Sequence, residues 1–95
     1  MTRLKVSRPA ETDLLGIWIY LAEHDLPAGR ILRKITSRFA DLQRFPGMGR
    51  ARPQWGANFR SLAVENYVIV YKTTDAGVEV LRVLHGAQDI DALWP

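Results

Sequence analysis

Residues 59–84, FRSLAVENYVIVYKTTDAGVEVLRVL, decide the fold, because three runs rich in β-branched and aromatic residues are separated by short polar breaks. The three runs are Phe59–Val64, Tyr67–Thr73 and Val78–Leu84. The breaks, Glu65-Asn66 and Thr74–Gly77, have the length of hairpin loops. The stretch therefore predicts a meander of three antiparallel strands.

Two segments upstream repeat their apolar residues every three or four positions, which predicts amphipathic helices. The first covers residues 10–24 and the second residues 28–45. Since only about four residues link them, the helices are expected to lie side by side as an antiparallel hairpin. Alternation of apolar and polar residues around Leu4 and Val6 predicts a strand before the first helix.

The remaining segments complete an α+β fold. Residues 46–58 carry prolines and glycines without a period and are interpreted as a long surface loop, while residues 86–93 can form a short C-terminal helix. We expect an N-terminal strand, the helical hairpin, the three-stranded meander and this helix in one domain, residues 1–95, since the chain is long enough for one core only.

Short loops also predict the register, with Val64 opposite Tyr67 and Thr73 opposite Val78. One sheet face then collects small and apolar residues and is the expected seat of the helices: Phe59, Ser61, Ala63, Val68, Val70, Leu81 and Val83. The opposite face would carry Arg60, Tyr71 and Arg82 among aliphatic residues. These two arginines could grip two points of one ligand, or they could pair with local acids such as Glu65 or Asp89.

Further candidates for binding lie outside the strands. Arg50, Arg52 and Trp55 in the loop could stack on a base or dock in a protein groove, or they could be solvated loop residues. His85 follows the last strand and is either a general acid or base at the sheet edge or a strand-end histidine without a role.

Composition excludes several classes of protein. The chain has no cysteine, which removes disulfides and thiolate zinc sites and favours a reducing compartment, the cytoplasm. It has no apolar segment of membrane-spanning length and no secretory leader, so no membrane partner is expected. No metal, nucleotide or hydrolase motif is present, so no cofactor is expected. The net charge of +3 suits nucleic acid or an acidic protein equally.

Several segments together carry a family resemblance. They are AETDLLGIWIYL at residues 10–21, FPGMG at 45–49, RSL at 60–62, YVIVY at 67–71 and RVLHGAQD at 82–89. In this order and spacing they resemble the ParE toxins of the ParE/RelE superfamily from Leu4 to Leu93. The fold of that family, two helices on an antiparallel sheet, agrees with the architecture expected from periodicity.

The resemblance implies the toxin half of a bacterial type II toxin-antitoxin pair. Such a toxin is neutralised by a ParD-like antitoxin, and the complex meets operator DNA through the antitoxin. In the ParE branch the toxin poisons DNA gyrase, whereas in the RelE branch it cleaves messenger RNA on the ribosome. A toxin that has become inert or purely regulatory is a third possibility.

RNA cleavage needs a base, an acid and cations around one phosphate. Arg60 and Arg82 match the sheet arginines of the superfamily, but Gly86 follows His85 where some nuclease members have a tyrosine. The acid-base half of the machinery is therefore missing. We expect a non-enzymatic gyrase inhibitor, with a RelE-like ribosome-dependent endonuclease as the alternative.

An antitoxin helix would dock into an apolar groove beside the first helix or at the sheet edge. The candidate contacts are Trp18, Leu21, Ile31 and Ile35, each of which could instead belong to the core.

Overall fold

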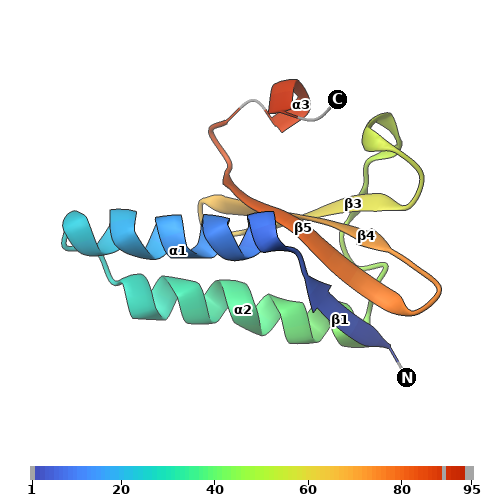
Figure 1. Cartoon of the computed structure of the whole chain (residues 1–95), viewed down its shortest axis with the longest axis horizontal. Helices are drawn as coiled ribbons and strands as arrows, with labels where there is room; N and C mark the ends of the chain where they lie inside the picture. The colour runs from blue at the N-terminus through green and yellow to red at the C-terminus, as the bar shows by residue number, and fades with distance from the viewer. Residues whose placement is uncertain (1, 89, 94–95) are drawn as a thin grey trace.

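The computed structural model describes residues 2–88 and 90–93, in which two helices pack against a sheet (Figure 1). Helices α1 (Arg8–Glu23) and α2 (Ala28–Arg44) run antiparallel, as their short link predicts. The strands are β1 (Arg3–Val6), β2 (Arg50–Ala51), β3 (Phe59–Val64), β4 (Tyr67–Thr73) and β5 (Gly77–His85), followed by a short helix, α3 (Ile90–Leu93). The predicted α+β architecture is confirmed.

The five strands form one sheet in the order β1-β5-β4-β3-β2. Strands β3, β4 and β5 make the predicted antiparallel meander, with Val64 opposite Tyr67 and Thr73 opposite Val78. Strand β1 pairs in parallel with β5, so the sheet is mixed and not purely antiparallel. This close pairing depends on Gly77, whose φ is +152° and at which a Cβ would collide with the backbone of Arg3.

The helices cover the sheet face opposite to the predicted one. Their buried side chains, led by Ile35 and Phe39, form one core with the following residues of β3, β4 and β5: Val64, Tyr67, Ile69, Tyr71, Val78, Val80 and Val83. Burial of apolar area drives this choice, because Tyr71 and Ile69 offer far more of it than Ser61 or other residues of the predicted seat. The prediction weighed the arginines and not the apolar volume.

A β-bulge in β5 shifts the predicted register for the second half of the strand. Tyr71 lies opposite Val80 as predicted, but Val70 lies opposite Arg82, which leaves Leu81 as an extra residue. Every side chain after Leu81 therefore points to the face opposite to that expected.

The bulge separates the two arginines. Arg82 shares a face with Val70, away from the helices, whereas Arg60 pairs with Tyr71 on the helix-bearing face. The predicted open surface carrying both arginines is therefore wrong.

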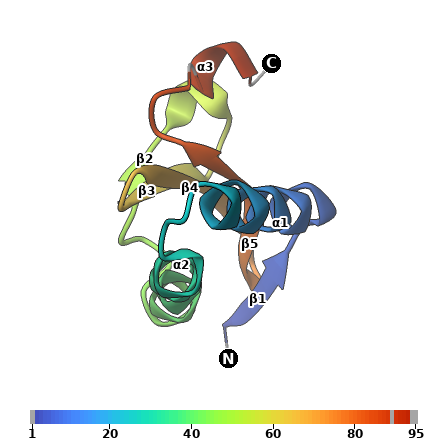
Figure 2. The same ribbon diagram turned by 90° about the vertical axis from the view of Figure 1, so that its left-hand side faces the viewer.

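The second face of the sheet is also partly covered. Residues 46–58, predicted as an irregular loop, contain β2 and a 3₁₀ turn, η1 (Pro53–Trp55). Trp55 packs with Val70 and Leu84 in a second apolar cluster. Figure 2 shows this segment and α3 on the side of the sheet away from α2. Apolar burial thus holds the segment against the sheet.

Candidate functional site

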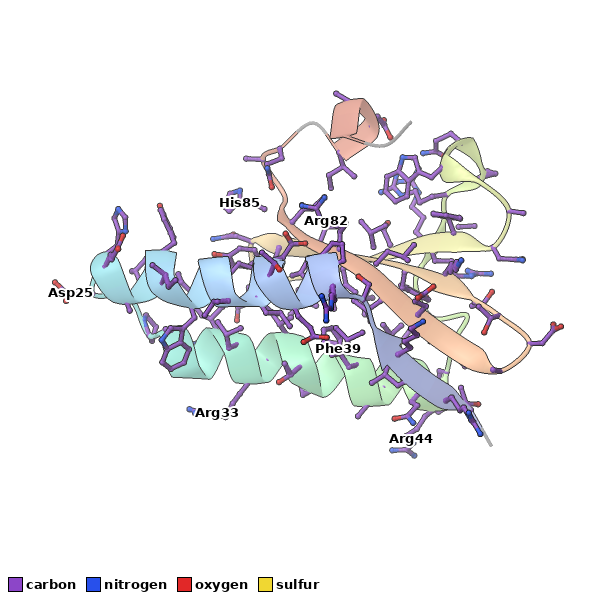
Figure 3. All side chains as sticks on the ribbon, viewed as in Figure 1. Asp25, Arg33, Phe39, Arg44, Arg82 and His85 are labelled. Atoms are coloured by element: carbon purple, nitrogen blue, oxygen red, sulfur yellow. The ribbon has the colours of Figure 1, made fainter. Side chains whose placement is uncertain are left out.

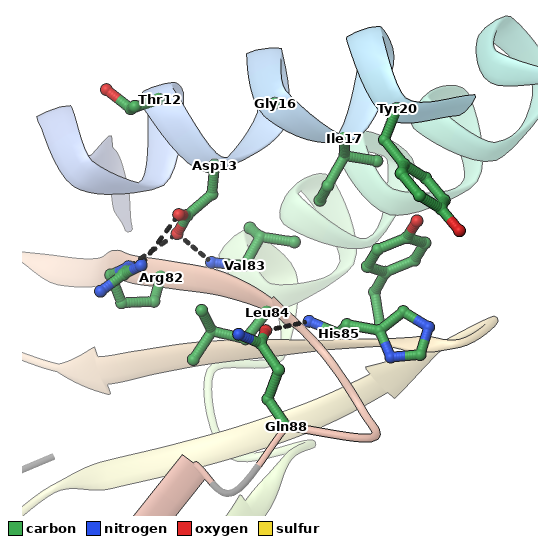
Figure 4. Close-up of a pocket in the computed structure, with 11 residues that line it drawn as sticks. Thr12, Asp13, Gly16, Ile17, Tyr20, Arg82, Val83, Leu84, His85 and Gln88 are labelled. Carbon is green, nitrogen blue, oxygen red and sulfur yellow. Dashed lines mark hydrogen bonds and ion pairs between the residues drawn. The ribbon is translucent and has the colours of Figure 1, made fainter. Parts of the chain in front are cut away.

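A hollow of about 560 Å³ lies between α1 and the end of β5, and we call it the α1–β5 cleft (Figure 4). Helix α1 contributes Asp13, Gly16 and Tyr20, among others, to its lining. The sheet side contributes Tyr67, Arg82 and His85, among others. Only Arg82 and His85 of the predicted target-binding residues meet in this cleft.

The cleft exists because β1 is shorter than β5. Strand β1 pairs with β5 only as far as Val80, so α1 lies along the remaining edge. Ser7 joins the two elements, since its hydroxyl donates to the carbonyl of Leu81 at 2.8 Å and accepts the N–H of Ala10 at 3.2 Å. The same side chain therefore caps α1 and satisfies the open strand edge.

Asp13 and Arg82 form an ion pair across the floor of the cleft. The Arg82 guanidinium donates from Nε at 2.7 Å and from a terminal nitrogen at 3.0 Å, and the backbone N–H of Val83 donates to the same carboxylate at 2.9 Å. The hydrogen bond to Asp13 raises the pKa of Arg82 above its ordinary range. Arg82 is therefore a neutralised, positioned cation. The prediction of a local acid partner for this arginine named Asp89, which lies outside the described residues, and Glu65, which pairs with Lys34 instead.

Aromatic rings line the other end of the cleft. Tyr67 and His85 make an edge-to-face contact with centroids 5.4 Å apart, and Tyr20 lies beside His24 at 4.2 Å. Burial raises the pKa of Tyr67. The Nδ1 atom of His85 accepts the N–H of Ala87 at 3.1 Å, so the neutral ring carries its proton on Nε2. This end offers π faces and a ring N–H donor.

Arg60 and Tyr71 hold the segment after α2. The Arg60 guanidinium donates to the carbonyls of Gly49 at 2.8 Å and Gly47 at 3.2 Å. The fully buried Tyr71 donates its hydroxyl proton to the carbonyl of Pro46 at 2.8 Å and accepts the N–H of Gly49 at 2.9 Å. Both residues are therefore structural clamps, and Tyr71 is not accessible to a partner.

The loop candidates are also separated. Arg52 donates to the Ser61 hydroxyl at 2.8 Å and lies over the ring of Trp55 at 5.1 Å. Trp55 is buried and donates its ring N–H to Asp91, so it is not available to stack on a base. Arg50 is exposed in β2. The structure does not bring these three residues to the α1–β5 cleft.

The predicted antitoxin contacts divide between core and surface. Leu21 and Ile35 are buried and Ile31 is half-buried against the core, so the core alternative holds for these residues. Trp18 is 48% exposed. The sequence reasoning missed its exposed neighbours Leu15 and Ile19, although the nearly continuous apolar run of α1 is typical of a helix that needs a second partner.

Two further kinds of site were sought within residues 2–88 and 90–93. In that range no group of three or more His, Cys, Asp or Glu side chains is placed to hold a metal ion. No helix there is both long and apolar enough to cross a bilayer.

Comparison with known proteins supports one family. Residues 4–90 match the family model described as "ParE toxin of type II toxin-antitoxin system, parDE". Toxin ParE3 of Caulobacter vibrioides is 29% identical over 94 residues, which cover 97% of this chain and 94% of that protein.

Two solved structures share the fold. A chain of the chromosomal ParDE system of P. aeruginosa matches with a TM-score of 0.77 at 24% identity, covering 90% of this chain and 96% of that chain. A chain of the toxin-antitoxin complex RelBE2 from Mycobacterium tuberculosis matches with a TM-score of 0.64 at 28% identity, covering 88% and 96% respectively.

Proposed function

Because the chain belongs to the ParE toxin family of type II toxin-antitoxin systems, we propose that it inhibits DNA gyrase and is neutralised by a ParD-like antitoxin. The observation that carries the proposal is the family match over residues 4–90. One domain spanning the chain acts in the cytoplasm, and operator DNA is met through the antitoxin complex. Inhibition is by binding, without chemistry on the target.

The arrangement of the arginines supports inhibition over RNA cleavage. Cleavage at a 2′-hydroxyl needs cations, a base and an acid around one phosphate. Arg60 and Arg82 lie on opposite faces of the sheet and cannot contact the same phosphate. Arg60 is bound to backbone carbonyls and Arg82 to Asp13. Neither guanidinium is free to stabilise a transition state.

The target contacts the α1–β5 cleft. Arg82 and His85 meet there, and the cleft offers a hollow of about 560 Å³ with aromatic walls. A side chain of the target can insert beside Gly16, because nothing lies within 4 Å of the position of a Cβ at that glycine. Arg50 at β2 belongs to the rim of the proposed interface only if the target also reaches that edge.

The antitoxin docks on the outer side of α1. Leu15, Trp18 and Ile19 follow one another at three- and four-residue spacing and are 61%, 48% and 47% exposed. An exposed tryptophan beside two aliphatic side chains is the kind of anchor that dominates protein interfaces. The likeness to a chain of the RelBE2 complex supports a partner of this kind.

The test is a supercoiling and cleavage assay with purified gyrase. The wild-type protein is expected to inhibit supercoiling and to accumulate cleaved DNA, and Arg82→Ala is expected to lose most of this effect. Trp18→Glu serves as the matched variant, because it should still inhibit gyrase but escape the antitoxin. Full gyrase activity at saturating wild-type protein would overturn the proposal.

The likeness to a chain of the RelBE2 complex also favours the second candidate, a RelE-like ribosome-dependent endonuclease. Translation reactions with a defined messenger RNA separate the two. Cleavage at codon positions by the pure protein, with gyrase unaffected, would replace the first proposal with the second.

A further inference from the structure

The positive charge of the protein is concentrated on α2. This helix holds five of the thirteen Lys and Arg residues but only one of the ten Asp and Glu residues, a net charge of +4. The rest of the chain has eight basic and nine acidic residues, a net charge of −1. One helix therefore accounts for the basic character of the whole molecule.

These residues line the outer side of the helix, and we call them the α2 basic stripe: Arg30, Arg33, Lys34, Arg38 and Arg44. All five are exposed, and in Figure 3 Arg33 and Arg44 point away from the body of the protein. They occur at steps of three, four or six residues, opposite to the buried Ile35 and Leu42. At 1.5 Å per residue the stripe extends over about 21 Å.

Most of this charge is not neutralised within the fold. Lys34 pairs with Glu65 at 2.7 Å and Arg38 with Asp41 at 3.1 Å. Arg30, Arg33 and Arg44 form no ion pair with any acid in residues 2–88 and 90–93. Like charges four residues apart, such as Arg30 and Lys34, destabilise a helix. The stripe therefore costs folding stability, and a partner must offset that cost if it is to be of use.

The side chains of the stripe fit a phosphate backbone better than a protein or a single strand. Protein interfaces are anchored by apolar or aromatic residues, and the exposed large apolar residues of the described structure lie outside α2: Leu15, Trp18, Ile19, Tyr20, Leu26, Phe45 and Met48. Single-stranded nucleic acid needs aromatic rings for stacking, whereas Phe39, the aromatic residue of α2, is buried. Rows of Arg and Lys are what phosphates require.

We propose that the α2 basic stripe binds the phosphate backbone of double-stranded DNA, without regard to sequence. B-form DNA is the duplex that it fits, because its major groove is wide enough for an α-helix whereas that of duplex RNA is too narrow. The site is separate from the α1–β5 cleft and from the outer side of α1. It goes beyond the proposed function, since the binding needs neither gyrase nor antitoxin.

Fluorescence anisotropy with a labelled 30-base-pair DNA duplex of unrelated sequence tests the proposal. The wild-type chain is expected to bind with a dissociation constant on the order of 10⁻⁴ to 10⁻⁶ M near physiological salt. The variant Arg30→Gln/Arg33→Gln/Arg44→Gln should bind about 10-fold or more weakly, and its salt dependence should fall by about three contacts. It should fold at least as stably as the wild type, because it relieves repulsion.

Two matched variants make the test specific. Arg3→Gln/Lys5→Gln/Arg8→Gln removes three exposed positive charges elsewhere and should keep the wild-type affinity. Changing Arg30, Arg33 and Arg44 to Lys keeps the charges and should retain most of the binding. Absence of DNA binding by the wild type, or equal loss in the control at residues 3, 5 and 8, would overturn the proposal. Preference for duplex RNA or for polyglutamate over DNA would do the same.

Discussion

Asp13 of α1 and Arg82 of β5 join the helical layer to the sheet at the point where β1 no longer covers the strand edge. Their side chains are 14% and 34% exposed, and their atoms approach to 2.7 Å. The same carboxylate accepts the N–H of Val83, which the short β1 leaves without a strand partner. One acid therefore replaces both a missing strand neighbour and a counter-ion.

Replacing Asp13 by Ala should lower the free energy of unfolding by about 1–3 kcal/mol, because it removes the acceptor of a partly buried N–H and the partner of Arg82. In a double-mutant cycle with Arg82→Ala, the coupling energy should be about 1 kcal/mol, reduced by solvent screening of the guanidinium. Urea denaturation of the four proteins measures it. Lys5→Ala, which breaks the exposed pair with Glu79, is the control and should change stability by less than about 0.5 kcal/mol. A coupling energy near zero would contradict the assigned role of the pair.

Gly49 lies under the Tyr71 hydroxyl, and Gly49→Ala should be strongly destabilising. A Cβ there would lie 2.5 Å from the Tyr71 hydroxyl oxygen and 2.7 Å from the carbonyl oxygen of Ser61. The backbone must shift, at a cost of about 1–3 kcal/mol. Gly47→Ala is the matched control, since nothing lies within 4 Å of its Cβ position. Equal melting temperatures of the two variants would show that the clamp of residues 46–49 yields easily.

The strands, the helical hairpin and the register nearest each turn could be predicted from sequence, because they depend on local periodicity and loop length. The pairing of Val64 with Tyr67 is an example. The bulge at Leu81 could not, since no residue near it differs from ordinary strand residues. Because side chains alternate along a strand, this one extra residue reversed the expected direction of Arg82.

The candidate site was predicted less completely than the fold. His85 and Arg82 were identified as chemically notable residues, but Asp13 lies far from them in sequence and has no motif that links it to Arg82. Trp55 was read as a loop residue because its burial depends on the distant Val70 and Leu84. Contacts between distant segments decide such cases, and local patterns do not report them.

The free energy of unfolding should fall as the pH rises above about 10, in part because of Tyr67. Burial raises the pKa of Tyr67 above its ordinary value of 10.0 in the folded protein. The unfolded chain therefore loses this proton at a lower pH than the native state, so stability present below pH 10 is lost as the pH rises through the folded pKa. Urea denaturation at several pH values should show a shallower decline for Tyr67→Phe than for the wild type. Parallel declines would exclude this contribution.

Gly16 lies at the wall of the α1–β5 cleft and permits a test that separates stability from binding. Nothing lies within 4 Å of its Cβ position, and a helix-interior glycine costs about 0.5–1 kcal/mol relative to alanine, so Gly16→Ala should stabilise the protein. Gly16→Leu also favours the helix but fills the cleft. It should weaken gyrase inhibition by about 10-fold or more, a loss of about 1.4 kcal/mol of binding. Its affinity for the antitoxin should stay close to that of the wild type, because Trp18 and Ile19 lie outside the residues that line the cleft. The variant Trp18→Glu should show the opposite pattern. If Gly16→Leu instead lost the antitoxin and kept gyrase inhibition, the two surfaces would have to be exchanged.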